Sequence, residues 1–383
     1  MRVGIFSESY EPVINGVAVC VQTLRDELVR SGHEVVVFAP YYRGFKDPYA
    51  HVFRFPSWRT PFAPDYPLPL PFSRSMKKAF ASSDLDIVHT QTPFLLGILG
   101  ARWARQRGIP VVSTNHTLYT EYAHYAPLLP KKLVARVLIA HMRRYYNGCD
   151  AVATPSRPAR ERLIGYGVRT RIEVIAGGVN AGAPAIEDGF RERIGLPGRA
   201  KALLYVGRLA KEKNLDMLLS AFQLVLREAP ETWLVVVGGG PYEKALQEHA
   251  RDLGVDERVI FVGPMAPSQV RSAYTVGDVF LWPSVTETQG LAVCEALSAG
   301  LPCVAVRAGG TPECVREEVD GLLTNNDTRE FAESALKLLR DDGLRRRMAK
   351  EAAKNASRFS TAETAAKFLD LYSSVISERR KGA

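Results

Sequence analysis

Short apolar segments alternate with helical repeats along almost the whole chain, and this alternation limits the folds that it can adopt. Residues 2–6 have the apolar composition of a strand. A helix follows, because apolar residues recur every three or four positions at Val17, Val21, Leu24 and Leu28. The same reasoning predicts further strands at 33–39, 86–90, 110–114, 151–154, 173–175, 202–206, 233–237, 259–262, 279–282, 302–306 and 322–324. Strands that alternate with helices favour parallel, doubly wound α/β sheets.

The alternation stops once and then restarts, which divides the 383 residues into two domains. Small and polar residues from Gly177 to Gly189 have the composition of a linker, and a chain of this length is long for a single core. We therefore predict one Rossmann-like domain at 1–180 and a second at 181–360. A last helix at 361–383 is expected to pack back toward the first domain. The cleft between two such domains is the expected binding site.

Several classes of protein do not fit the composition. No apolar run approaches the ~20 residues that a membrane-spanning helix needs, and the first residues turn polar too early for a signal peptide. The five cysteines are scattered and contain no Cys-x-x-Cys pair. We therefore expect a reduced, cytoplasmic protein with neither disulfides nor a zinc site.

The positive charge is concentrated in the first half of the chain. Residues 1–180 contain 23 Lys and Arg against 13 Asp and Glu, whereas residues 181–383 contain 27 against 28. Such an asymmetry suggests nucleic acid or an anionic membrane surface as a partner of the first domain.

The stretch from Ser284 to Gly300, SVTETQGLAVCEALSAG, changes from loop to helix between two carboxylates. Glu287 lies in the loop, and Glu295 follows two helical turns further on. If the helix begins near Gly290, the free N–H groups of Gln289, Gly290 and Leu291 can bind phosphate through unpaired donors and the helix dipole. The flanking carboxylates suit the hydroxyls of a sugar and a ribose. On spacing alone, a solvated helix with two surface glutamates explains the pattern equally well.

Four other residues lie where an α/β fold binds ligands. Arg208 and Lys213 flank the turn after the strand at 202–206, where two cations can hold a diphosphate or simply form an exposed basic loop. Gly16 lies at the start of the first helix, and His116 follows the strand at 110–114. A plain turn residue and a structural histidine are the alternatives for these two. The chain has no Ser-His-Asp pattern, no metal-ligand spacing, no Walker A lysine and no intact G-x-G-x-x-G.

Together these residues resemble the family 4 glycosyltransferases. Glu287 and Glu295 match the E-x7-E motif of that family within PSVTETQGLAVCEALSAGLPCVA, and GRLAKEKN, the Asn-Gly at 15–16 and His116 match in order and spacing. The resemblance covers essentially the whole chain. It implies a GT-B fold of two Rossmann-like domains with a nucleotide-sugar in the cleft, and transfer with retention of anomeric configuration and without a metal ion or other cofactor.

The resemblance also assigns roles. It implies that Arg208 and Lys213 hold the diphosphate and stabilise the leaving group, that Glu287 contacts hydroxyls of the donor sugar, and that Glu295 contacts the ribose. Gly16 and the backbone amides of Gln289, Gly290 and Leu291 would approach the phosphates and the sugar, and His116 would face the sugar. The family commonly has an aromatic residue at the position of Gln289, which leaves the sugar preference open.

Within the family, the sequences T-E-T-Q-G and HTLYTEYAHY resemble those of bacterial diacylglycerol glucosyltransferases. This resemblance implies transfer of a hexose, here glucose, from the nucleotide-sugar UDP-glucose to a membrane lipid such as diacylglycerol at the inner face of the cell membrane. The alternatives are a soluble sugar or metabolite as acceptor, a nucleotide-sugar epimerase, and a nucleic-acid-binding module. The last fits poorly, because the phosphate-type residues lie in the half without excess charge.

A basic helix is predicted at 130–146, in the positively charged half. It carries Lys131, Lys132, Arg136, Arg143 and Arg144 and no acid. Its apolar residues are spaced to form one face, which is typical of a helix lying on anionic lipid. The same pattern is found in a helix that packs on the sheet and turns its charges to solvent. Aromatic residues in the proline-rich segment 54–72 are candidate membrane anchors beside it: Phe55, Trp58, Phe62 and Tyr66.

Overall fold

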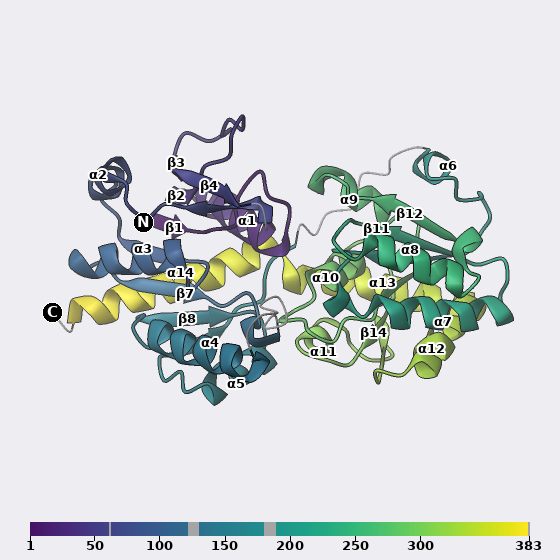
Figure 1. The fold of residues 1–383 in the computed structure, drawn as a ribbon. Helices are drawn as coiled ribbons and strands as arrows, with labels where there is room; N and C mark the ends of the chain where they lie inside the picture. The colour runs from purple at the N-terminus through teal and green to yellow at the C-terminus, as the bar shows by residue number, and fades with distance from the viewer. Residues whose placement is uncertain (61–62, 122–129, 180–188, 382–383) are drawn as a thin grey trace. The chain divides into compact units, whose positions relative to one another are not determined.

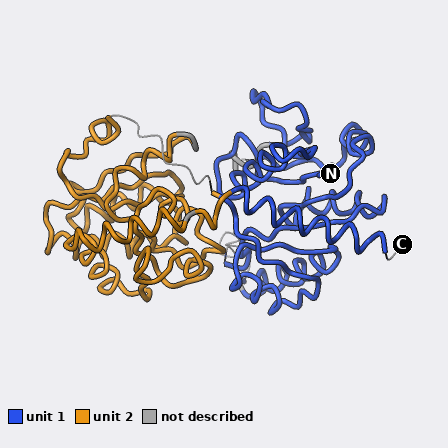
Figure 2. Tube along the Cα trace, turned by 180° about the vertical axis from the view of Figure 1, so that it is seen from behind, with its two compact units in different colours: residues 1–178, 361–383 blue, residues 179–360 orange. Residues whose placement is uncertain are grey.

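The computed structural model describes the chain except for residues 61–62, 122–129, 180–188 and 382–383, and it omits the side chains of 59–60, 63–66, 131, 267–268 and 356. The chain forms two compact units, which Figure 2 shows in different colours. Unit 1 comprises Met1–Gly178 and Thr361–Ala383, and unit 2 comprises Val179–Ser360. The predicted linker falls largely on 180–188, outside the described residues.

Unit 1 is built on a seven-stranded parallel sheet with the order β3-β2-β1-β6-β7-β8-β9. The strands are short and apolar, and both faces are covered, as the near-continuous Val and Ile content of a buried parallel strand requires. Their bounds are β1 (Arg2–Phe6), β2 (Glu34–Pro40), β3 (Val52–Phe55), β6 (Ile87–Thr90), β7 (Val111–Thr114), β8 (Ala151–Thr154) and β9 (Ile172–Val174). All of these strands except β3 were predicted from the sequence, within two residues at each end.

Helices cover both faces of this sheet (Figure 1). One face packs against α1 (Gly16–Arg30) and α14 (Thr361–Lys381). The other packs against α2 (Arg74–Ser82), α3 (Leu95–Gln106), α4 (Lys131–Tyr146) and α5 (Arg157–Gly165). The last helix is part of the core of unit 1, since Phe368, Leu371 and Tyr372 are buried there. Tyr372 Oη lies 2.7 Å from Nδ1 of the buried His89 in β6.

The proline-rich segment, which shows no helical pattern, contains strands. After β3, the antiparallel pair β4 (Ser57–Thr60) and β5 (Ala63–Pro69) forms a separate two-stranded sheet. Trp58 pairs with Leu68 across the hairpin, and both are exposed, by 63% and 44%. Phe55 is buried in the core, so it cannot act as a membrane anchor. Phe62 and the Tyr66 side chain lie outside the described part of the chain.

Unit 2 contains a six-stranded parallel sheet with the order β12-β11-β10-β13-β14-β15, which is the Rossmann order. Its strands are β10 (Ala202–Val206), β11 (Trp233–Val237), β12 (Val259–Gly263), β13 (Val279–Trp282), β14 (Cys303–Val306) and β15 (Gly321–Thr324). Its α-helices are α6 (Phe190–Arg193), α7 (Leu215–Glu228), α8 (Glu243–Asp252), α9 (Pro267–Ala273), α10 (Leu291–Ser298), α11 (Thr311–Cys314), α12 (Thr328–Arg340) and α13 (Asp342–Asn355), with 3-10 turns at Lys211–Lys213, Asp256–Arg258 and Ala356–Phe359. The predicted α/β class with two Rossmann-like sheets is confirmed.

Candidate active site

The strand order of unit 2 creates a topological switch point at one edge of its sheet. β10 lies between β11 and β13, so the connections after β10 and β13 leave in opposite directions. Open α/β sheets bind ligands at such a switch point, beyond the carboxyl ends of the strands. Arg208 follows β10 by two residues, and Glu287 follows β13 by five. The residues predicted to bind the donor therefore emerge at the place where the topology favours a ligand.

Lys213 and Glu287 form an ion pair at this edge. Lys213 Nζ lies 2.6 Å from Glu287 Oε1, and the two side chains are 16% and 14% exposed. The Ser284 hydroxyl donates a hydrogen bond of 2.7 Å to the same carboxylate oxygen. A half-buried pair of this kind fixes both groups and leaves their other polar atoms available to a ligand that carries negative charge and hydroxyls.

Aromatic residues pack next to Lys213. The ammonium of Lys213 lies 5.5 Å from the centre of the Trp282 ring, at the end of β13. Trp282 stacks on Tyr205 of β10 with ring centres 5.6 Å apart, and the Tyr205 hydroxyl donates to the backbone carbonyl of Arg208 at 3.1 Å. The Arg208 side chain itself is exposed, and no ion pair holds its guanidinium within the described residues. Within the described residues, the turn after β10 thus carries one unpaired cation, Arg208, and one paired cation, Lys213.

The loop that carries Glu287 packs backbone to backbone against two glycines. The Gly310 N–H donates to the Glu287 carbonyl at 3.0 Å. A Cβ atom added at Gly309 would lie 2.1 Å from that carbonyl oxygen, and one at Gly310 would lie 2.1 Å from the Thr288 oxygen. Only glycine fits at either position. Sequence reasoning missed both residues; the signal that could have indicated them is the Gly-Gly pair before Thr311-Pro312.

Helix α10 begins where it was predicted. Gly290 precedes it with φ of +100°, which favours glycine, and Leu291 is its first residue. The Gln289 side chain is buried, with Nε2 3.6 Å from Cys294 Sγ, so this amide points into the core. Glu295 lies on α10 and accepts a hydrogen bond of 2.7 Å from the Tyr274 hydroxyl. Burial raises the pKa of Glu295, and the hydrogen bond from Tyr274 opposes that shift.

In unit 1, His116 lies just beyond β7, and its Nε2 is 2.7 Å from Gln91 Oε1. Burial lowers the pKa of His116 to about 4, so the ring is neutral near pH 7. Gly16 is the exposed first residue of α1, and the preceding Asn15 caps that helix by accepting a hydrogen bond of 2.8 Å from the Ala18 N–H. Both residues lie at a carboxyl-end loop of the sheet of unit 1, as the sequence pattern indicated.

Comparisons with known proteins identify the family of this chain. The profile of the family described as "Glycosyl transferases group 1" matches residues 187–355, and that of "Glycosyltransferase Family 4" matches residues 14–182. The chain is 36% identical over 323 residues to an alpha-monoglucosyldiacylglycerol synthase of Streptococcus pneumoniae, which covers 80% of this chain and 71% of that protein. The chain belongs to the family 4 glycosyltransferases.

Other relatives and solved structures extend the comparison. A GDP-mannose-dependent alpha-mannosyltransferase of Corynebacterium glutamicum is 30% identical over 89% of this chain and 81% of its own length. Among solved structures, Anabaena HepE in complex with UDP superposes with a TM-score of 0.78 at 21% identity, covering 98% of this chain and 100% of HepE. Sucrose-phosphate synthase from Thermosynechococcus elongatus gives 0.82 at 20% identity, covering 98% and 99%. These likenesses show the GT-B fold, and the family makes the chain a hexosyltransferase rather than an epimerase.

Helix α4 of this glycosyltransferase is only half embedded. Its C-terminal part packs on the sheet through the buried Met142, Tyr145 and Tyr146, whereas Leu133 and Val137 are 51% and 60% exposed. The exposed face also carries Lys132, Arg136, Arg143 and Arg144, and none of these forms an ion pair within the described residues. The Lys131 side chain lies outside the described part. The face that meets solvent is therefore basic and apolar at once, which a simple packing role does not require.

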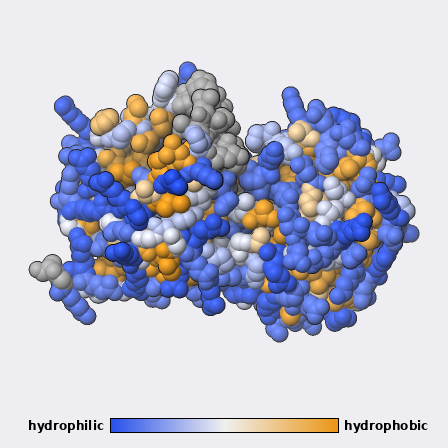
Figure 3. All heavy atoms as spheres, turned by 60° about the horizontal axis from the view of Figure 1, so that its bottom comes forward, coloured by the Kyte–Doolittle hydropathy of each residue, from blue (hydrophilic) through white to orange (hydrophobic). Residues whose placement is uncertain are grey.

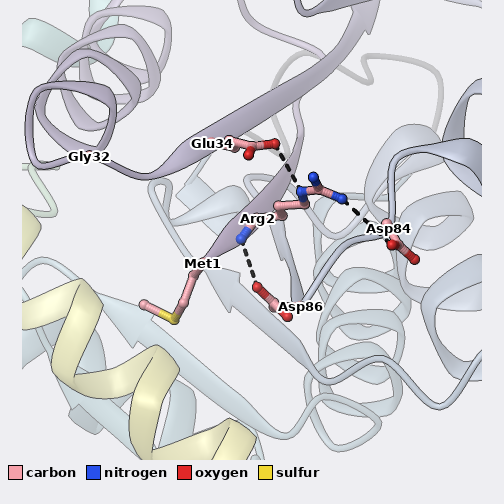
Figure 4. A pocket seen from close by; sticks show the side chains of 6 residues that line it. All are labelled: Met1, Arg2, Gly32, Glu34, Asp84 and Asp86. Atoms are coloured by element: carbon pink, nitrogen blue, oxygen red, sulfur yellow. Dashed lines mark hydrogen bonds and ion pairs between the residues drawn. The ribbon is translucent and has the colours of Figure 1, made fainter.

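A pocket also lies at the opposite, amino-terminal edge of the sheet in unit 1 (Figure 4). Three acids line it, and all three contact Arg2: Glu34 Oε2 lies 2.9 Å from Nε, Asp84 Oδ2 lies 3.5 Å from Nη1, and Asp86 Oδ2 accepts from the backbone N–H at 2.8 Å. These contacts tie the start of β1 to β2 and to the turn before β6. We assign this pocket to strand anchoring.

Across the described residues, no helix is long and apolar enough to cross a membrane. The same residues contain no group of three or more His, Cys, Asp or Glu side chains placed to hold a metal ion.

Proposed function

We propose that this glycosyltransferase moves glucose from UDP-glucose to a membrane lipid such as diacylglycerol, with retention of configuration and without a metal ion. The observation that carries the proposal is the group of charged residues at the switch point of unit 2. Lys213 and Glu287 are paired there, and Arg208 forms no ion pair with any residue that the structure describes. The similarity to the pneumococcal alpha-monoglucosyldiacylglycerol synthase supports the choice of sugar and acceptor.

Arg208 and Lys213 would bind the diphosphate of the donor. As the glycosidic bond breaks, negative charge grows on the leaving nucleoside diphosphate, and two cations already in place stabilise it without reorganisation. This is the charge that a metal ion supplies in other phosphate-leaving reactions. The N–H groups of Gln289, Gly290 and Leu291 at the start of α10 would add donors to the phosphates and the sugar.

The carboxylates and the neutral histidine suit the hydroxyl groups of the donor. Glu287, held by Lys213 and Ser284, would accept hydrogen bonds from the sugar. Glu295 would accept from the ribose, and His116 would contact the sugar from unit 1. Gly16 lacks a side chain at the start of α1, which allows close approach of a phosphate or a sugar.

The lipid acceptor is supported by the surface of unit 1. We propose that α4 lies on anionic headgroups at the inner face of the membrane, with Leu133 and Val137 toward the acyl boundary and the basic residues toward phosphate. Trp58, Leu68, Leu70 and Phe72 are further exposed apolar side chains at and after the β4–β5 hairpin. In the view of Figure 3, apolar side chains gather in a patch on unit 1 among hydrophilic surface.

The second candidate is transfer of mannose from GDP-mannose. It is favoured by the similarity to GDP-mannose-dependent mannosyltransferases at 30–32% identity. For either donor, the screen described next also identifies the acceptor, because a soluble sugar or metabolite competes there with the lipid.

A single screen tests these choices. The purified protein is incubated with UDP-glucose, UDP-galactose, UDP-N-acetylglucosamine or GDP-mannose, each with diacylglycerol vesicles or with a mixture of soluble sugars, and the products are identified by mass spectrometry. We expect a glucosylated lipid from UDP-glucose, with an α-anomeric linkage by NMR. A mannosylated product would select the second candidate, and an inverted linkage would refute retention.

A further inference from the structure

Unit 1 has its own switch point, between β1 and β6. Glu8 follows β1 and Gln91 follows β6 directly, so both lie at the carboxyl edge where ligands bind in α/β sheets. His116 lies at the same edge, after the neighbouring β7. Of these three residues, only His116 was recognised from the sequence.

Gln91 is held rigidly at this edge. Its backbone N–H donates to the Phe6 carbonyl at 2.9 Å. The hydroxyl of the preceding Thr90 forms a hydrogen bond of 2.7 Å with the Tyr145 hydroxyl. The hydroxyl of the following Thr92 donates to the Glu8 carboxyl group. The Gln91 side chain is 1% exposed. Its amide group therefore has a fixed position from which to orient a neighbour.

That neighbour is His116. Gln91 Oε1 lies 2.7 Å from His116 Nε2. A carbonyl oxygen can only accept, so this contact requires a proton on Nε2 and leaves the Nδ1 lone pair as an acceptor. Because the ring is neutral near pH 7, the choice between its two tautomers decides which atom can donate to a ligand and which can accept.

The amide nitrogen of Gln91 indicates that this glutamine does not serve the stability of the fold. Gln91 Nε2 is buried and has no hydrogen-bond partner within the described residues. An unsatisfied buried donor lowers stability, and an apolar residue of the same size would avoid this cost. A glutamine retained at such a position is expected where its carbonyl is needed.

We propose that Gln91 is the positioning residue of His116 and fixes its imidazole in the Nε2–H tautomer, with Nδ1 as the acceptor. The consequence is that the oriented ring contacts a hydroxyl of the transferred hexose, and this consequence rests on the proposed function.

The first test reads the tautomer without reference to activity. The full-length protein is labelled with 15N in its histidine rings, and the His116 signals are assigned by their loss in His116→Ala. The natural protein should show Nε2–H. Gln91→Leu should lose this preference, whereas Gln91→Glu, which keeps an acceptor oxygen, should retain it. Nδ1–H in the natural protein, or an unchanged tautomer in Gln91→Leu, would overturn the proposal.

The second test reads the kinetics. Gln91→Leu should lower kcat for hexose transfer about tenfold, the loss expected from one misplaced hydrogen bond, and Gln91→Glu should recover most of it. The matched control is Gln223→Leu, which removes a half-buried amide that donates to the Leu253 carbonyl at 2.8 Å in unit 2. It should leave kcat unchanged. If the protein transfers no hexose at all, the proposed function fails, while the ring spectra still decide the role of Gln91.

Discussion

Replacing Glu8 by glutamine should remove a pH dependence of stability that resides in unit 1. Glu8 Oε1 accepts a hydrogen bond of 2.7 Å from the Leu96 N–H, so its carboxyl group caps the start of α3, a helix that lacks a side-chain cap of its own. Burial raises the pKa of Glu8 from its ordinary 4.5 to about 7, and the backbone hydrogen bonds at Leu96 and Gly97 oppose this shift only in part.

The magnitude follows from these two pKa values. A change from 4.5 to about 7 corresponds to about 3–4 kcal/mol at most, at ~1.4 kcal/mol for each pH unit. Because the folded protein binds this proton more tightly than the unfolded chain, the contribution is complete below about pH 4.5. It is lost as the pH rises through about 7. His89 and His116, whose pKa values burial lowers from 6.5 to about 3 and about 4, act in the opposite direction as the pH falls. Only the difference between variant and natural protein therefore isolates Glu8.

The assay is urea unfolding of both proteins at pH 5 and pH 8, together with a 13C titration of the carboxyl carbons. Glu8→Gln should gain up to about 3 kcal/mol relative to the natural protein between these pH values. The same change at the exposed Glu161 of α5 controls for the substitution itself. An equal pH dependence of both proteins, or a Glu8 carbon that titrates near pH 4.5, would refute the reasoning.

Three further predictions concern the site and the surface. Glu287→Gln and Arg208→Ala should each lower transfer more than tenfold, since one charged contact contributes ~2–4 kcal/mol in the transition state, with circular dichroism unchanged; near-normal turnover in either would remove that residue from the site. Activity should survive excess EDTA, and strict dependence on magnesium or manganese would contradict metal-independent transfer. The protein should sediment with anionic but not neutral vesicles at low salt. Replacing Lys131, Lys132, Arg143 and Arg144 by glutamate should abolish this binding. Glutamate at the exposed unit 2 residues Lys244, Arg346, Arg347 and Lys350 should not; equal binding to both vesicle types would assign α4 to packing alone.

Local patterns predicted most of the fold and a defined part of the site. Buried parallel strands such as Ala202–Val206 are continuous apolar runs, and the repeat of apolar residues marks helices such as α1, so both could be found without a structure. The β4–β5 hairpin was missed because prolines obscure the alternation of a strand.

Contacts between distant segments could not be predicted in this way. Lys213 and Glu287 were each expected to meet a ligand, yet their ion pair joins residues 74 positions apart. The backbone carbonyls of Glu287 and Thr288 pack against Gly309 and Gly310, and no local sequence rule connects these two pairs of residues. The hydrogen bond between His89 and Tyr372 spans 283 positions, and it shows why a lone histidine in a strand cannot be assigned from the sequence.

The placement of α14 has a consequence for how the protein is made. Unit 2 is continuous in the chain, from Val179 to Ser360, whereas unit 1 needs the segment from Thr361 onward to cover one face of its sheet. During synthesis, unit 2 can fold as soon as it leaves the ribosome. In the nascent unit 1, however, the surface around Val21, Leu24 and His89 stays uncovered until residues 361–381 emerge. Loss of residues 361–383 by a premature stop codon would thus leave unit 1 incomplete and prone to aggregate, although unit 2 would be intact.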